Sequence, residues 1–186
     1  MRKERGRSSG RIVAMSLALM TALACSEEVN TPVANADLQA MEAAYVAYGM
    51  VSFVTASGVR EGRIEADTAY VYEESSTAML RQMSIVFYDE FGAENATVTG
   101  EFGDWNQETN RMVARGDVVL LIHGDSSRIE SAEIYYDPGL EKVWSDSLTT
   151  RIMSDGNVMS GTAFESDMAF ENITIENMRG GARRVF

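Results

Sequence analysis

The sequence contains few of the residues that build disulfides, zinc sites and histidine-dependent active sites. Its 186 residues include 1 cysteine, 1 histidine and 2 prolines. A single cysteine excludes a disulfide within the chain, and a Cys/His zinc cluster needs more ligands than these residues supply. Basic residues are scarce as well, since residues 25–186 hold 11 basic and 27 acidic residues, a net charge of −16. This charge argues against a nucleic-acid-binding surface.

The N-terminus carries a short basic segment followed by a short apolar one. Five of the basic residues lie within residues 2–11, and residues 12–24 are uncharged and mostly apolar. A helix that spans a bilayer needs about 20 apolar residues, more than this segment has. We therefore expect residues 1–24 to be a secretory signal peptide.

The only cysteine directly follows this apolar segment. Ala22-Leu23-Ala24-Cys25 resembles a bacterial lipobox, although Ala22 stands where leucine is usual. The resemblance implies that Cys25 is acylated and becomes the first residue of a membrane-anchored lipoprotein. An ordinary signal peptide with an incidental cysteine is the alternative. Acyl chains would give lasting anchorage, because each buried methylene contributes about 0.8 kcal/mol.

Residues 25–47 are expected to form a tether between the anchor and the folded body. The first part is polar and includes Pro32. Residues 37–47 place Leu38, Met41 and Ala44 on one helical face, which is compatible with a short helix. We expect the folded domain to occupy residues 48–186.

The body of the chain shows the period-two alternation of β-strands. In residues 111–122, Met112, Ala114 and Val118 fall on one face, while Arg115 and Asp117 fall on the other. Turn signals such as Asp-Pro-Gly and Asp-Gly separate such runs, and the last apolar strand is expected over 170–176. No long stretch has helical periodicity. The sequence predicts an all-β domain.

Similar segments recur along the body at a regular distance. Ala66, Gly100, Ser131 and Ser166 begin equivalent steps, at spacings of 34, 31 and 35 residues. Each unit reads as a strand, a small residue, an acidic corner and a returning strand. A period in this range is typical of stacked units that share one core. We expect an elongated, open-ended jelly roll built of repeated antiparallel strands; a compact β-sandwich is the alternative.

Four motifs together resemble a known family over about residues 45–180. They are Gly62-x-Ile64-x-Ala66-Asp67, Phe87-Tyr88-Asp89-x-x-Gly92, Ala114-x-Gly116-Asp117-Val118 and Gly161-x-x-Phe164-x-Ser166-Asp167. Their order and spacing resemble the LptC family of periplasmic lipopolysaccharide-export proteins and, more widely, the OstA-like β-jelly roll. Many family members carry an N-terminal transmembrane helix, where this chain has the lipobox.

The resemblance implies a bridge for lipopolysaccharide in the periplasm. Such a protein accepts the glycolipid from an inner-membrane ABC transporter and passes it to an LptA-like jelly-roll protein joined edge to edge. Together with the lipobox, it implies a lipid-anchored protein on the periplasmic side of the inner membrane, and we expect no cofactor. A structural β-rich cell-envelope lipoprotein without lipid cargo is the alternative.

Alternating apolar residues are the candidates for a lipid-binding groove, because acyl chains crossing water need a continuous apolar surface. The candidate groove residues are Ile64, Ala66, Ile85, Phe87, Val98, Met112, Val118, Leu120, Ile134, Tyr136, Phe164 and Phe170. Ordinary core packing is the other interpretation of each. Ile173 and Ile175 are the candidates for an edge that pairs with the partner protein.

The same sequence gives little support to an enzyme or a metal site. Asp67, Asp89, Asp104 and Asp167 could pair as glycosidase carboxylates, but they recur at expected corners, where aspartate favours turns. His123 has no Ser or Cys partner in a recognisable motif. No acidic run has the ligand spacing of a calcium loop. We therefore expect no catalytic residues and no metal.

Overall fold

The computed structural model describes residues 43–56 and 58–183, and their regular structure consists of β-strands. Within this part of the chain no helix is long and apolar enough to cross a membrane. The predicted signal peptide, the lipobox-like segment with Cys25 and most of the predicted tether lie outside the described residues. The strands are β1 (Tyr45–Ala56), β2 (Val59–Tyr72), β3 (Thr77–Tyr88), β4 (Glu94–Asn106), β5 (Met112–Ile122), β6 (Ser127–Asp137), β7 (Lys142–Ser145), β8 (Thr149–Ile152), β9 (Asn157–Gly161), β10 (Ala163–Asp167), β11 (Ile173–Glu176) and β12 (Arg179–Arg183).

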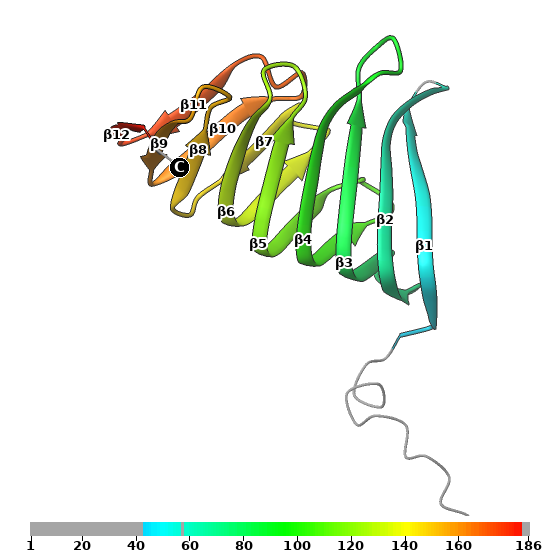
Figure 1. Cartoon of the computed structure of the whole chain (residues 1–186). Helices are drawn as coiled ribbons and strands as arrows, with labels where there is room; N and C mark the ends of the chain where they lie inside the picture. The colour runs from blue at the N-terminus through cyan, green and yellow to red at the C-terminus, as the bar shows by residue number, and fades with distance from the viewer. Residues whose placement is uncertain (1–42, 57, 184–186) are drawn as a thin grey trace, which may run out of the picture. The chain divides into compact units, whose positions relative to one another are not determined.

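All twelve strands belong to one antiparallel sheet (Figure 1). Strands β1 to β6 pair in sequence order, each with its neighbour. Strand β6 then divides the sheet, because residues 135–137 pair with β7 while residues 128–131 pair with β8. One branch continues through β7, β10 and β11, and the other through β8, β9 and β12.

A row of irregular residues crosses the six long strands. The ladder pairs Tyr48 with Thr68 and Met50 with Ala66, but Gly49 and Asp67 between them do not form a ladder pair. Positive φ angles mark the same row at Gly49, Gln82, Gly116 and Asp117, and such local breaks let a sheet bend sharply. This corner row consists of Gly49, Asp67, Gln82, Glu101, Gly116, Asp117 and Ala132.

The corner row divides each long strand into two halves and shifts its pattern of burial. In β2, Ile64 and Ala66 are buried before the corner, whereas Ala69 and Val71 are buried after it. The extra residue at Asp67 changes which positions point inward, because side chains alternate with period two. Both halves therefore direct apolar side chains to the same interior. We call the half with Val71 and its branch β7–β10–β11 wall 1, and the half with Ile64 and its branch β8–β9–β12 wall 2.

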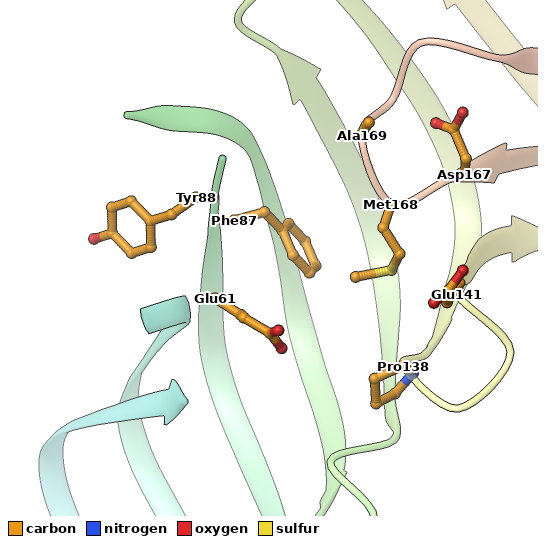
Figure 2. A pocket seen from close by; sticks show the side chains of 8 residues that line it. All are labelled: Glu61, Phe87, Tyr88, Pro138, Glu141, Asp167, Met168 and Ala169. Carbon is orange, nitrogen blue, oxygen red and sulfur yellow. The ribbon is translucent and has the colours of Figure 1, made fainter. Parts of the chain in front are cut away.

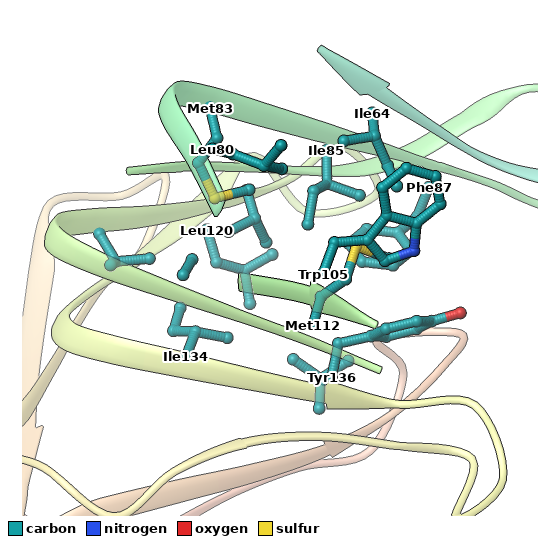
Figure 3. Close-up of a cluster of buried hydrophobic side chains, with 14 of the residues drawn as sticks. Ile64, Leu80, Met83, Ile85, Phe87, Trp105, Met112, Leu120, Ile134 and Tyr136 are labelled. Atoms are coloured by element: carbon teal, nitrogen blue, oxygen red, sulfur yellow. The ribbon is translucent and has the colours of Figure 1, made fainter. Parts of the chain in front are cut away.

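The two walls face each other across one hydrophobic core (Figure 3). Met83 of wall 2 lies close to Gly103 of wall 1, where a Cβ would come within 2.6 Å of the Met83 sulfur. Phe87 of wall 2 and Tyr136 of wall 1 have ring centroids 5.1 Å apart. The absence of a side chain at Gly103 therefore lets the walls approach closely beside the bend.

Buried hydroxyl groups occupy the point where β6 divides the sheet. Ser131 and Ser145 share a hydrogen bond of 2.9 Å, and the Thr149 hydroxyl donates to the Ser147 carbonyl oxygen at 3.0 Å. Ser131, Ser145 and Thr149 are buried, and their mutual hydrogen bonds satisfy groups that would otherwise be costly to bury. This cluster connects the two branches.

The all-β prediction is confirmed, and so is the open-ended jelly roll of antiparallel strands. The strand path runs from β1 to β11 without returning to β1, in one continuous sheet. The predicted repeat is correct for Ala66, Gly100 and Ser131, which lie along the corner row. It is wrong for Ser166, which pairs with Val143 in wall 1, because the short strands no longer cross both walls.

Two predicted element boundaries also need correction. Strand β1 already begins at Tyr45, so the short helix that the sequence allowed over 37–47 is wrong in its last residues. Pairing of Tyr45 with Val71 outweighs a weak helical preference. Residues 37–42 lie outside the described part. The strand expected over 170–176 begins only at Ile173, and Phe170 lies in the preceding loop with φ +56°.

Candidate functional site

The twelve predicted groove residues all lie in the shared interior of the two walls. Each is a member of the single buried core, and none has more than 5% of its surface exposed. Period-two alternation thus located residues that come together in space. In this structure they pack against one another and fill the interior.

The inner surface of wall 2 carries an uninterrupted apolar row. Ile64, Ile85, Val98, Leu120 and Ile129 are neighbours on five consecutive strands. Adjacent strands lie about 4.8 Å apart, so the row extends roughly 19 Å across the sheet. Ile129 was not among the predicted residues, although it lies on the same face of β6 as the buried Ser127 and Ser131.

Wall 1 contributes a matching row that sequence reasoning identified only in part. Trp105, Met112, Tyr136 and Val143 are cross-strand neighbours, and only Met112 and Tyr136 were predicted. Trp105 was missed because alternation counted from Val98 places it on the outer face. The corner residue in β4 reverses this phase and turns the indole inward.

Trp105 and Tyr136 are the polar features of this apolar interior. The Trp105 indole nitrogen is buried and has no hydrogen-bond partner, which leaves a donor unsatisfied at a cost of about 1–3 kcal/mol. Burial, together with the nearby Glu61 and Asp137 carboxylates, raises the pKa of Tyr136 to about 12. The phenol therefore stays neutral at physiological pH.

A cleft of about 440 Å³ opens beside the aromatic end of the core (Figure 2). Phe87 and Met168 point toward each other within it. Carboxylates are present at its rim, including those of Glu61 and Glu141. The residues lining the cleft are Glu61, Phe87, Tyr88, Pro138, Glu141, Asp167, Met168 and Ala169.

The loop between β10 and β11 brings Phe170 into the core next to this cleft. The Phe170 ring centroid lies 5.5 Å from that of Phe87. The Asn95 side-chain amide donates to the Ala169 carbonyl oxygen at 2.9 Å, although these residues are far apart in the sequence. Within the loop, the Asp167 carboxylate accepts from the Glu171 backbone at 3.0 Å and from the Asn172 amide at 2.5 Å.

The four aspartates weighed as catalytic carboxylates have separate structural surroundings. Asp89 accepts hydrogen bonds from the backbone nitrogens of Phe91 and Ala93 in the β3–β4 turn. Asp104 forms an ion pair with Arg115 across adjacent strands. Asp67 belongs to the corner row and Asp167 organises the β10–β11 loop, so the structure does not bring the four together as a site.

The structure also shows where His123 and the predicted edge residues lie. The His123 ring nitrogen lies 3.0 Å from the Thr97 hydroxyl on the exposed outer face. Ile173 and Ile175 lie on β11, which pairs with β10 and ends the strand path of wall 1. Both side chains are half-buried against the core. Their pairing with a partner protein stays a proposal.

Two folded walls around a continuous apolar interior, with end strands left open, define an open-ended β-jelly roll. The family described as "Lipopolysaccharide-assembly, LptC-related" matches residues 11–181. The chain belongs to this family, and its role is therefore in lipopolysaccharide transport.

LptH of Pseudomonas aeruginosa, described as the LptA-homologous periplasmic component of the lipopolysaccharide transport device, matches with a TM-score of 0.49 and 15% sequence identity. The match covers 66% of this chain and 90% of LptH. No curated protein matches the sequence.

Proposed function

We propose that this protein is a periplasmic bridge for lipopolysaccharide, which it accepts from an inner-membrane ABC transporter and passes to an LptA-like jelly-roll protein. The observation that carries the proposal is the apolar interior, which lies between the two walls and extends along the sheet between its two open ends. Each acyl methylene exposed to water costs about 0.8 kcal/mol, so cargo needs such a lining along its whole path. The twelve predicted groove residues would form it.

Photo-crosslinking tests the path of the cargo. A photoreactive residue at position 87 or 120 should capture lipopolysaccharide in cells in an ATP-dependent way, because both side chains face the interior. Positions 115 and 117, which face outward, serve as controls and should capture none. Equal capture at inner and outer positions would refute a one-sided apolar path.

The transfer step is proposed to use β11 as the edge for the next jelly roll. An edge strand has unpaired backbone groups that another protein can continue in register. Ile173→Pro removes a backbone donor and should weaken crosslinking to the partner more than it lowers the free energy of unfolding. Unchanged crosslinking to the LptA-like protein would place the contact on another strand.

Membrane attachment through Cys25 is part of the same proposal and is tested separately. Metabolic labelling with a fatty-acid probe should label the parent protein but not a Cys25→Ala variant. Equal labelling of both proteins would refute the lipobox interpretation. A lipid anchor on the periplasmic side of the inner membrane would hold the jelly roll near the transporter.

A structural lipoprotein without lipid cargo is the second candidate, and the packed interior favours it. All twelve groove candidates are buried, so a lipid can enter only if some of them move. A pull-down distinguishes the two functions, because the bridge should recover the transporter and an LptA-like protein. Recovery of neither, together with no lipid capture at position 120, would favour the structural role.

A further inference from the structure

Phe170 differs from the other members of the hydrophobic core in the way it reaches the interior. In the described part of the chain, every other buried core residue lies on a strand of the sheet, whereas Phe170 lies in the loop between Asp167 and Ile173. We call residues 168–172 the plug loop. Strand residues cannot leave the interior without breaking the ladder, but a loop residue can.

Few interactions hold the plug loop in place. It contacts the neighbouring β3–β4 region through the hydrogen bond from Asn95 to the Ala169 carbonyl oxygen and through Phe170 against Phe87, and Met168 packs against the core. Its other hydrogen bonds run from Phe170, Glu171 and Asn172 to Asp167, the last residue of β10, from which the loop starts. Phe170 also has φ +56°, a conformation that side-chain-bearing residues seldom adopt because of steric crowding. Release of the loop would relieve this strain.

The position of Phe170 suits an apolar chain. Its ring lies among aromatic side chains, at 5.5 Å from Phe87, which in turn contacts Tyr136. The cleft outside is lined by Phe87, which contacts Phe170, and by the loop residues Met168 and Ala169 that precede it (Figure 2). Carboxylates at the rim, such as that of Glu61, disfavour an anionic headgroup inside, so only the acyl part of a glycolipid fits.

We propose that Phe170 is a displaceable occupant of the cargo path, and that the plug loop swings out when an acyl chain of the glycolipid takes its place between the walls. This inference rests on the proposed function, because it assumes that lipid enters the interior. A loop that fills the path in the absence of cargo keeps the apolar interior dry. Binding would exchange one apolar occupant for another.

Removal of the occupant tests the proposal. The full-length Phe170→Ala protein should bind cis-parinaric acid, a fluorescent fatty acid, about tenfold more tightly, because a larger fraction of molecules is competent to bind. Phe91→Ala removes the same side chain at a site that is 86% exposed, and should leave the affinity unchanged. Asn95→Ala weakens the loop contact without opening a core cavity and should give a smaller gain. Parent-like affinity in both loop variants would overturn the proposal.

Hydrogen–deuterium exchange tests the movement itself. Addition of lipopolysaccharide to the full-length protein should increase exchange in residues 168–172 while β2–β6 keep their protection. Crosslinking of lipid at position 120 without this increase would overturn the plug and leave the proposed function standing. No capture at position 120 and no binding of the fatty acid would overturn both.

Discussion

Strands β1–β6 each cross both walls of the jelly roll, whereas β7–β12 each belong to one wall. In the long-strand region every corner is flanked by the corners of neighbouring strands, so the bend is propagated through the ladder. The short-strand region has no shared corner, and its two branches are joined by the hydroxyl cluster at Ser131 and by contacts between strand ends. A continuous ladder therefore stabilises the interior in the long-strand region, whereas individual side-chain and strand-end contacts stabilise it in the short-strand region.

The largest expected effect comes from a charge at the centre of the long-strand region. Leu120 is completely buried in the apolar row of wall 2, so Leu120→Asp should lower the free energy of unfolding by about 4 kcal/mol or more. Leu121→Asp is the matched control, because its side chain faces outward and is 40% exposed. Chemical denaturation measures both. A folded Leu120→Asp protein with near-parent stability would mean that this interior admits water.

The short-strand region should be most sensitive where two strand ends meet. A Cβ at Gly161 would overlap the Glu176 carbonyl oxygen and the Ile175 side chain, so Gly161→Ala must displace backbone. We expect a loss of about 3 kcal/mol. Gly103→Ala in the long-strand region would meet the flexible Met83 side chain and should cost about 1 kcal/mol. Thermal unfolding compares the two, and the reverse order would contradict this account of the junction.

The corner row should be sensitive to backbone conformation. Gly116 has φ +77°, and a Cβ there would lie 2.9 Å from a Glu101 carboxylate oxygen, so Gly116→Ala should cost about 2 kcal/mol. Gly124→Ala, in the open β5–β6 turn, has no atom within 4 Å of the added Cβ and should change stability by less than about 0.5 kcal/mol. Equal unfolding midpoints for both variants would show that the bend does not depend on this corner.

The same contrast explains how far the sequence could predict the structure. In β5, Gly116 and Asp117 together preserve the phase, so alternation correctly placed Met112 and Val118 on one face. In β4, the single corner residue Glu101 reverses the phase, and Trp105 was missed. The repeat failed at Ser166 because the division of the sheet at β6 depends on long-range pairing, which local patterns do not encode.

Phe170 shows a different limit of the sequence pattern. Alternation predicted it as an inward-facing strand residue, and it is buried, but it reaches the interior from a loop. An apolar side chain such as Phe170 predicts burial, but it does not predict whether the residue lies on a strand or in a loop. Only the fold reveals that the backbone there has a positive φ and that Asn95, distant in the sequence, contacts the loop.

The smallest expected effect concerns Tyr136, which lies where the two regions join and contacts Phe87 across the interior. Its pKa is raised to about 12 in the folded protein, whereas an exposed tyrosine titrates near 10. The folded state thus favours the protonated phenol. Stability is unaffected below pH 10 and is lost as pH rises from 10 through 12, because the unfolded chain ionises first.

Tyr136→Phe should remove this dependence on pH. At about pH 11 the parent should have lost about 1 kcal/mol that the variant retains, measured as the difference between their denaturation curves at neutral and alkaline pH. Tyr48→Phe, on the exposed outer face, controls for the loss of a phenol. The parent and Tyr136→Phe proteins would lose stability in parallel if the Tyr136 hydroxyl were open to water. That result would also mean that the aromatic end of the interior opens without cargo, since Phe170 is packed against the same Phe87 ring.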